Sequence, residues 1–293
     1  MKTYHILNPN KKNKSIVEKY WKGRRKNFSW VERTMHPTHL ETLVQWCDVE
    51  NIEHIVVWGG DGTFSRVLQA SYSQDTLSKF SFSLVPVGTC NDLSRKVQGL
   101  DWQEVADSIE HGKISKTAFD LGLMESGAQK RVFINNAGFG RSKEAIQNKK
   151  TNALKDIFSL AEKFIRLECF ENKKKIQCQM AFLMGIVFNA PYFSGGLHFS
   201  PIIEPTDGIL NGYFIQAQSK FQLLKSFIKA RYGDGYLTTP HMMNFSFEKM
   251  ELVSENDLYF QADGEVWSFE PMHEILFSVL PQVVSAFLPE TKS

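Results

Sequence analysis

The chain has 293 residues, which is enough for one large domain or two of ordinary size. Hydrophobic residues make up 42% of it and charged residues 23%, so the sequence can bury substantial cores and is not that of a disordered protein. Lysine and arginine (34) nearly balance aspartate and glutamate (32), and the net charge of +2 argues against a dedicated nucleic-acid binder.

Neither the cysteines nor the apolar runs indicate an exported or membrane-spanning protein. The four cysteines form no CxxC pair and have no histidine at metal-ligand spacing, so we interpret them as reduced thiols in a cytoplasmic protein. The N-terminus lacks the apolar core of a signal peptide. Residues 176–203 contain no Asp, Glu, Lys or Arg, but their apolar run ends after Phe188, too early for a spanning helix. We expect a soluble protein that reaches a membrane only peripherally.

The first 120 residues or so alternate short apolar runs with helical patterns. Strands are predicted at residues 4–7, 54–58 and 82–87, and helices over residues 15–26, from a capping box at Thr38 and Glu41, through Val67 and Leu68, and from near Asn91. Alternation of this kind predicts an α/β domain with a parallel sheet that is covered on both faces.

After Ala118 the candidate strands follow one another, as in an antiparallel sandwich or barrel. They are predicted at residues 118–124, 132–137, 180–190, 209–217, 245–253 and 258–262. Two helical patterns interrupt them, one from Leu154 to Ile165 and one from Phe221 to Ile228, each among basic residues. We expect domains at 1–120 and 121–281, and allow the C-terminal tail, about 282–293, to return to the first domain.

A glycine-rich loop follows the second predicted strand: Gly59, Gly60, Asp61, Gly62 and Thr63. Glycines let backbone amides approach a phosphate closely, and a helix N-terminus adds a partial positive charge. The pattern therefore predicts a phosphate-binding loop. A tight turn that only joins strand to helix is the alternative. The loop is not a P-loop, because the Gly-Lys-Ser/Thr ending is absent.

A second loop, residues 86–92, follows the next predicted strand. Its Gly88 and Thr89 would lie at the carboxyl edge of the parallel sheet, where open α/β sheets bind ligands. Asn91 and Asp92 are equally well explained as caps of the helix that follows.

Further along the chain, Asp263 and Glu265 alternate, so we expect both acids to face one side of a strand; a solvated turn is the alternative. Asp207-Gly208 is equally typical of an ordinary β-turn.

Together these motifs resemble the diacylglycerol-kinase-like lipid kinases, whose relatives include sphingosine and ceramide kinases and, more distantly, NAD kinases. The resemblance is tightest to the small lipid kinases of bacteria. The matching positions run nearly end to end: Asn8-Pro9, residues 59–63, residues 86–92, residues 119–122, the sequence FINNAGFG at 133–140, Asn189, Gly195-Gly196, residues 207–209 and residues 261–265.

The resemblance implies an N-terminal α/β nucleotide-binding domain with a parallel sheet, followed by a mainly antiparallel β-sandwich domain for the lipid substrate. It implies ATP as the donor, Mg²⁺ as the metal and a lipid hydroxyl as the acceptor. Glu265 would be the proton acceptor, with Asp263 and Asp120 as acidic companions, and Asp207 with Ile209 would bind Mg²⁺. The residues implied to hold ATP are Asn8, Pro9, Thr34, Gly59, Gly60, Asp61, Gly62, Thr63, Phe64, Ser65, Arg66, Gly88, Thr89, Asn91 and Asp92.

Two alternatives stay open beside an ATP- and Mg²⁺-dependent lipid kinase. One is a kinase of a soluble acceptor, related to NAD kinases. The other is a catalytically weak protein that binds nucleotide or lipid. The expected partner is a membrane lipid reached from the cytoplasm, with the basic helical patterns as docking surfaces, and no nucleic acid. The sequence does not decide the oligomeric state, a homodimer included.

Overall fold

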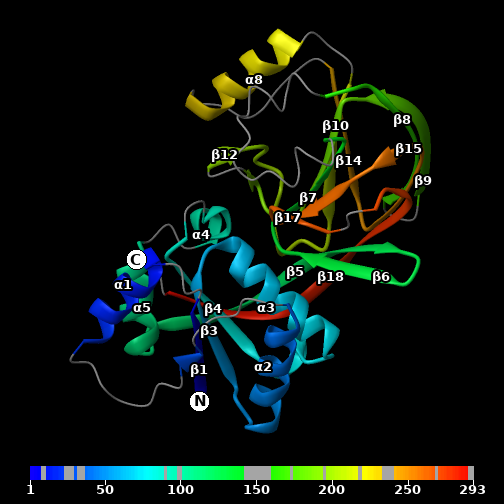
Figure 1. Cartoon of the computed structure of the whole chain (residues 1–293). Coiled ribbons are helices and arrows are strands. Elements are labelled where there is room, and N and C mark those ends of the chain that lie inside the picture. Colours follow the sequence, from blue (N-terminus) through cyan, green and yellow to red (C-terminus); the bar gives the residue numbers. More distant parts are fainter. Residues whose placement is uncertain are drawn as a thin grey trace. The chain divides into compact units, whose positions relative to one another are not determined.

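The structure is a computed structural model and describes residues 1–7, 11–22, 30–31, 37–88, 91–97, 101–141, 160–171, 174–193, 196–216, 220–232, 241–267 and 270–289. The chain divides into two compact units, which are considered separately (Figure 1). The first consists of Met1–Phe119 with Gln282–Ser293, and the second of Asp120–Pro281.

The first unit is a parallel sheet with helices around it. Its strands lie in the order β2-β1-β3-β4-β18 and all these neighbours are parallel. All six residues of β3 are buried, as expected for a strand covered on both faces. The strands are β1 (Thr3–Leu7), β2 (Trp30–Val31), β3 (His54–Gly59), β4 (Ser81–Pro86) and the C-terminal part of β18 (Met272–Pro289). The helices are α1 (Lys11–Trp21), α2 (Pro37–Val49), α3 (Asp61–Ser73), α4 (Asp92–Val97) and α5 (Trp102–Glu110), with a short 3-10 turn at Leu77–Lys79.

Three helices of the first unit differ from the sequence predictions. Helix α1 begins at Lys11 rather than at residue 15, and α2 begins at Pro37, so the expected capping box at Thr38 is wrong. Proline is favoured in the first turn of a helix because its missing N–H would have no partner there. The sequence analysis did not predict α5, although Asp101 and Glu104 form a complete capping box at its start.

The second unit contains two mainly antiparallel sheets. One has the order β14-β13-β10-β7-β16-β17, and the other joins β18, β15, β8 and β9, with β5 and β6 alongside. The strands are β5 (Ile114–Ser126), β6 (Gln129–Phe133), β7 (Asn136–Phe139), β8 (Lys163–Glu171), β9 (Lys174–Phe182), β10 (Met184–Phe188), β13 (Leu210–Ile215), β14 (Met242–Phe247), β15 (Lys249–Leu258), β16 (Phe260–Ala262) and β17 (Glu265–Val266), with a small hairpin of β11 (Tyr192–Phe193) and β12 (Leu197–His198). Helix α8 (Lys220–Tyr232) lies outside the sheets (Figure 1).

Phenylalanines fill the core of the second unit. Phe139 contacts Phe182, Phe214 and Phe260 at ring-centroid distances of 5.0–5.9 Å. A Cβ at Gly185 would overlap the ring of Phe139, so glycine is required where that ring crosses strand β10. Offset and edge-on aromatic contacts of this kind stabilise a core beyond their buried area.

The helix predicted from Leu154 to Ile165 is wrong where the structure describes it. Phe164 and Ile165 belong to strand β8, and residues 151–159 lie outside the described residues. Ile165, Leu167 and Cys169 are buried while their neighbours are more exposed, which is the alternation of a strand rather than a helix.

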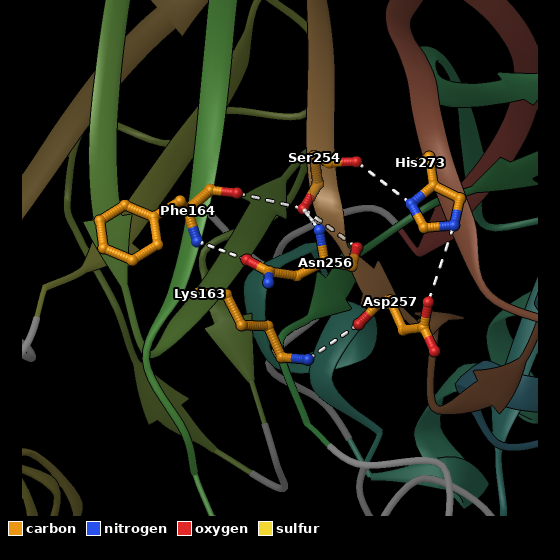
Figure 2. A network of polar contacts seen from close by, with 6 residues as sticks. All are labelled: Lys163, Phe164, Ser254, Asn256, Asp257 and His273. Atoms are coloured by element: carbon orange, nitrogen blue, oxygen red, sulfur yellow. Dashed lines mark hydrogen bonds and ion pairs between the residues drawn. The ribbon is translucent and has the colours of Figure 1, made fainter.

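A network of hydrogen bonds connects β8 to the irregular part of β15 (Figure 2). The pairing of β15 with β18 shifts register within residues 253–258. Asn256 Oδ1 accepts a hydrogen bond from the backbone N–H of Phe164 at 2.8 Å, and Lys163 Nζ donates to the backbone oxygen of Asp257 at 2.8 Å. Side chains therefore satisfy backbone groups that the disrupted ladder leaves unpaired.

The charge-free segment from residue 176 to 203 forms strands β9 and β10 and the β11–β12 hairpin, not one apolar helix. Within the described part of the chain, no helix combines the length and the hydropathy needed to cross a bilayer.

Candidate active site

The glycine loop joins β3 to α3, and no side chain caps that helix. Gly60 is the N-cap residue, with an extended backbone (φ −106°, ψ −177°). Its carbonyl oxygen accepts from the backbone N–H groups of Thr63 and Phe64 at 3.0 and 3.1 Å. The N-terminus of α5, in contrast, is closed by the Asp101 carboxylate. An uncapped N-terminus beside glycines is suited to bind an anion such as phosphate.

The loop after β4 lies against the glycine loop. The N–H of Gly88 donates to the carbonyl oxygen of Gly59 at 3.1 Å, and a Cβ at Gly88 would overlap the backbone of Gly60. Both loops follow the carboxyl ends of adjacent parallel strands, so the structure brings Gly59, Gly60 and Gly88 together at the edge expected for a ligand.

Asp61 caps a different helix from the one that it begins. Its buried carboxylate accepts from the backbone N–H groups of Asp92 at 2.6 Å and Leu93 at 3.2 Å, the first residues of α4. Asn91 Nδ2 donates to the carbonyl oxygens of Pro86 and Gly88 at 2.9 and 3.1 Å. Asp61 therefore supplies the cap of α4 that the sequence left to Asn91 or Asp92, and Asn91 fastens the loop.

The remaining residues predicted to hold ATP divide into three groups. Thr63, Phe64 and Ser65 are buried on the first turns of α3, and Phe64 packs edge-on to Phe82 at 6.4 Å. Gly62 lies in the same first turn, and the Arg66 side chain is exposed. Asn8, Pro9, Thr34 and Thr89 lie outside the described residues.

Asp263 and Glu265 do not face one side of a strand, so that prediction is wrong. Asp263 and Gly264 form the two-residue turn of a hairpin, with φ angles of 49° and 79°, and Ala262 pairs with Glu265 across it. Positive φ at both central residues is the signature of a type I′ turn, for which Asp-Gly is a favoured sequence. Glu265 opens β17 and is half-buried.

The Asp263 carboxylate is engaged by backbone amides. It accepts hydrogen bonds from the N–H groups of Ile134, Asn135 and Asn136 at 2.9, 2.8 and 3.1 Å, where β6 gives way to β7. The N–H of Gly264 donates to the Gln261 side-chain oxygen at 2.6 Å. The hydrogen bonds of Asp263 thus hold the hairpin on which Glu265 lies.

Asp120 lies in a buried polar cluster within the second unit. Its Oδ2 accepts from the N–H of Gly208 at 2.7 Å, and its own N–H donates to the carbonyl oxygen of Pro205 at 2.8 Å. Asn189 Nδ2 donates to the carbonyl oxygens of Asp120 at 3.0 Å and Ile134 at 2.7 Å. Asn189 therefore links Asp120 to the turn that Asp263 binds. The sequence analysis listed Asn189 among the positions that match the family but assigned no role to this residue.

Asp207, for which the resemblance implies Mg²⁺ binding, interacts electrostatically with two other acids. Burial raises the pKa of its carboxyl, and the negative charges of Asp120 and Glu204 raise it further, although a hydrogen bond from the N–H of Ile209 at 2.9 Å opposes the shift. Glu204 is a neighbour that the sequence analysis missed. A cation would relieve this repulsion.

Among the described residues, no three His, Cys, Asp or Glu side chains gather into a metal cluster. Mg²⁺ is commonly bound through one or two carboxylates, with water and other oxygens completing its shell. Magnesium binding by Asp207 and Ile209 therefore stays a prediction.

A glycine loop on a parallel sheet, followed by a β-sandwich that carries several acids, is consistent with a phosphotransferase. The sequence matches the family described as "Diacylglycerol kinase catalytic domain" over residues 5–122. Residues 129–288 match the "YegS C-terminal NAD kinase beta sandwich-like domain". The chain therefore belongs to the diacylglycerol kinase and YegS-like family of lipid kinases, and the predicted fold class is confirmed.

Relatives agree with this assignment, and solved structures share the fold. Proteins named "Probable lipid kinase YegS-like" are 26% identical over 270 residues in Pseudomonas syringae pv. syringae (88% of this chain, 83% of the relative) and 23% identical over 248 residues in Enterobacter sp. strain 638 (81% and 79%). A diacylglycerol kinase structure from Bacillus anthracis superposes with a TM-score of 0.69 at 15% identity, covering 97% of this chain and 96% of that one. An NAD kinase from Archaeoglobus fulgidus in complex with ATP gives 0.52 at 15% identity, covering 100% and 94%.

Proposed function

We propose that this protein transfers the γ-phosphate of ATP to the hydroxyl group of a membrane lipid such as diacylglycerol. The observation that carries the proposal is the N-terminus of α3 in the glycine loop, which no side chain caps and where Gly60 lies against Gly88. A buried structural helix would normally have its first amides satisfied by a side chain, as α4 and α5 do. Because no side chain caps α3, the start of this helix suits the phosphates of a nucleotide.

Phosphoryl transfer depends mainly on positioning and on neutralising charge, so few chemical groups are required. The amides at the start of α3 bind the phosphates, and glycine at 88 keeps side-chain atoms away from Gly60. Glu265 accepts the proton of the acceptor hydroxyl, and Asp263 holds the hairpin on which Glu265 lies. Asp207 and the carbonyl of Ile209 would hold a structural Mg²⁺, which would supply positive charge among the acids of the second unit.

The direct test is incubation of the purified protein with labelled ATP, Mg²⁺ and a total lipid extract. We expect label in a lipid fraction and none in the presence of excess chelator. NAD added as a competing acceptor tests whether the protein is instead a kinase of a soluble acceptor. Label in NAD rather than in lipid would indicate such a kinase. ATP binding without transfer to any acceptor would indicate the catalytically weak binding protein instead.

A lipid acceptor also requires a way to reach a bilayer. We infer that the protein acts at the cytoplasmic face of a membrane and binds it peripherally. Transfer to diacylglycerol in vesicles should therefore depend on vesicle composition, whereas transfer to a short-chain, monomeric diacylglycerol should not. Equal dependence on vesicles for both acceptors would contradict this part of the proposal.

A further inference from the structure

One face of helix α8 packs against a hydrophobic cluster of the second unit. Leu223 is 0% exposed and belongs to a hydrophobic cluster of the second unit that includes Phe188 and Phe199. Leu224 and Phe227 pack partly against the same cluster. These contacts fix which side of α8 faces outward.

The outer face of α8 carries large apolar side chains. Phe221 is 71% exposed and Ile228 is 51% exposed, and Lys225 between them is also exposed. At about 3.6 residues per turn, positions 221, 225 and 228 fall on one stripe on the side of the helix away from Leu223. Single exposed apolar residues are ordinary on protein surfaces, but two on one stripe with a lysine between them are typical of a helix that lies in a membrane interface.

The charge of α8 has one sign only. The helix contains Lys220, Lys225, Lys229 and Arg231, and no aspartate or glutamate occurs from residue 217 to 233. Its lysines therefore cannot form the acid–base pairs at three- or four-residue spacing that stabilise solvated helices. The helix is complementary to a negatively charged surface.

We propose that α8 is the element that docks this protein on an anionic lipid bilayer, with Phe221 and Ile228 inserted at the interface and Lys225 and Lys229 against the headgroups. The biological role of this docking rests on the proposed lipid-kinase function. The docking surface is inferred independently, from the exposure and charge of α8. Two apolar side chains are far less than the roughly 800 Å² per partner that a stable protein interface buries, whereas a bilayer needs only a few such groups together with basic charge. The occupant is therefore a lipid surface and not a second protein chain.

The test measures co-sedimentation with vesicles of phosphatidylcholine, with and without phosphatidylglycerol. Each lysine near an anionic leaflet contributes a factor of about five in partitioning, so K225Q/K229Q should bind anionic vesicles about 30-fold more weakly at low salt. The matched control is K113Q/K116Q, which removes the same charge from two other exposed lysines and should bind as the wild type does. F221S/I228S should lower binding at both low and high salt, because apolar insertion is not screened.

Anionic-vesicle binding by K225Q/K229Q equal to that of the control pair would overturn the proposal. So would a change of oligomeric state in F221S/I228S with vesicle binding unchanged, because the stripe would then be a protein interface. Transfer to a short-chain, monomeric diacylglycerol separates this proposal from the proposed function. If the wild type lacks that activity but the α8 variants bind vesicles more weakly, the proposed kinase function is wrong and the docking proposal is supported. If the activity is present but the α8 variants bind vesicles as the wild type does, the docking proposal is wrong and the kinase function is supported.

Discussion

At the scale of single residues, two acids separated by one glycine have different surroundings. Asp263 occupies a left-handed turn position with φ 49°, and its carboxylate accepts from three backbone amides. Glu265, the next residue but one, begins the returning strand and is half-buried. A carboxylate that is saturated by structural amides is poorly suited to accept a proton, so Glu265 is the better candidate for the general base.

Replacement of Glu265 by glutamine removes the proton acceptor but keeps the shape of the side chain. We expect phosphate transfer to fall about 10²–10⁴-fold, the usual effect of losing a general base. ATP binding and the thermal unfolding temperature should stay near those of the wild type. If Glu265→Gln retained more than half of the wild-type transfer rate, Glu265 would not be the base.

Replacement of Asp263 should act on the hairpin first and on transfer through it. Asp263→Ala leaves the N–H groups of Ile134, Asn135 and Asn136 without their acceptor, which should lower the free energy of unfolding by about 1–3 kcal/mol. Asp263→Asn retains one acceptor oxygen and should recover part of this loss, in both stability and kcat. Urea unfolding and kinetics on the two variants provide the measurement. A loss of kcat in Asp263→Asn with no loss of stability would instead make Asp263 part of the chemistry.

At the scale of elements, the helix N-termini of the first unit differ in whether a side chain caps them. Asp61 caps α4 and Asp101 caps α5, while α3 has no side-chain cap. The partner of Asp61 lies 31 residues further along the chain, so this cap joins the glycine loop to the start of α4.

The two caps provide a matched pair of variants. Asp61→Ala and Asp101→Ala should each lower the free energy of unfolding by about 1 kcal/mol, the usual cost of losing an N-cap. Only Asp61→Ala should also weaken ATP binding, because only Asp61 begins the helix of the glycine loop. Urea unfolding and a nucleotide-binding titration measure the two effects. Equal ATP affinity in both variants would show that the cap contributes stability alone.

The sequence predicted those elements whose signals are local. The strands at residues 54–58 and 82–87 were found because glycines or a proline-bearing loop end a buried apolar run, and α8 was found from its helical periodicity. The turn at Asp263 was kept only as the alternative, because alternation was weighed above the turn preference of Asp-Gly. The cap formed by Asp61 and the link made by Asn189 join residues 31 and 69 positions from their partners, so only the folded chain reveals them.

At the scale of the whole molecule, two buried histidines in the sheet of the first unit make the stability of the fold sensitive to acid. Burial lowers the pKa of His54 to about 4, and burial together with the charge of His54 lowers the pKa of His5 to about 3. His5 Nδ1 accepts from Trp58 Nε1 at 3.0 Å, and His54 Nε2 lies 2.9 Å from Ser83 Oγ, which donates to the carbonyl oxygen of Phe287 at 3.0 Å. Both rings are therefore neutral in the folded protein at neutral pH.

This arrangement predicts a loss of stability in mild acid. An unfolded histidine binds a proton below about pH 6.5, whereas the folded ones do not until the pH approaches their lowered pKa values. Their contribution is therefore complete above about pH 6.5 and declines as the pH falls, by about 2 kcal/mol for each histidine at pH 5. Urea unfolding of the wild type and of His54→Gln at pH 7 and pH 5 measures the difference, with the exposed His111→Gln as the control. The His54 variant should lose less stability between the two pH values than the other two proteins, and an equal loss in all three would show that His54 is not the source.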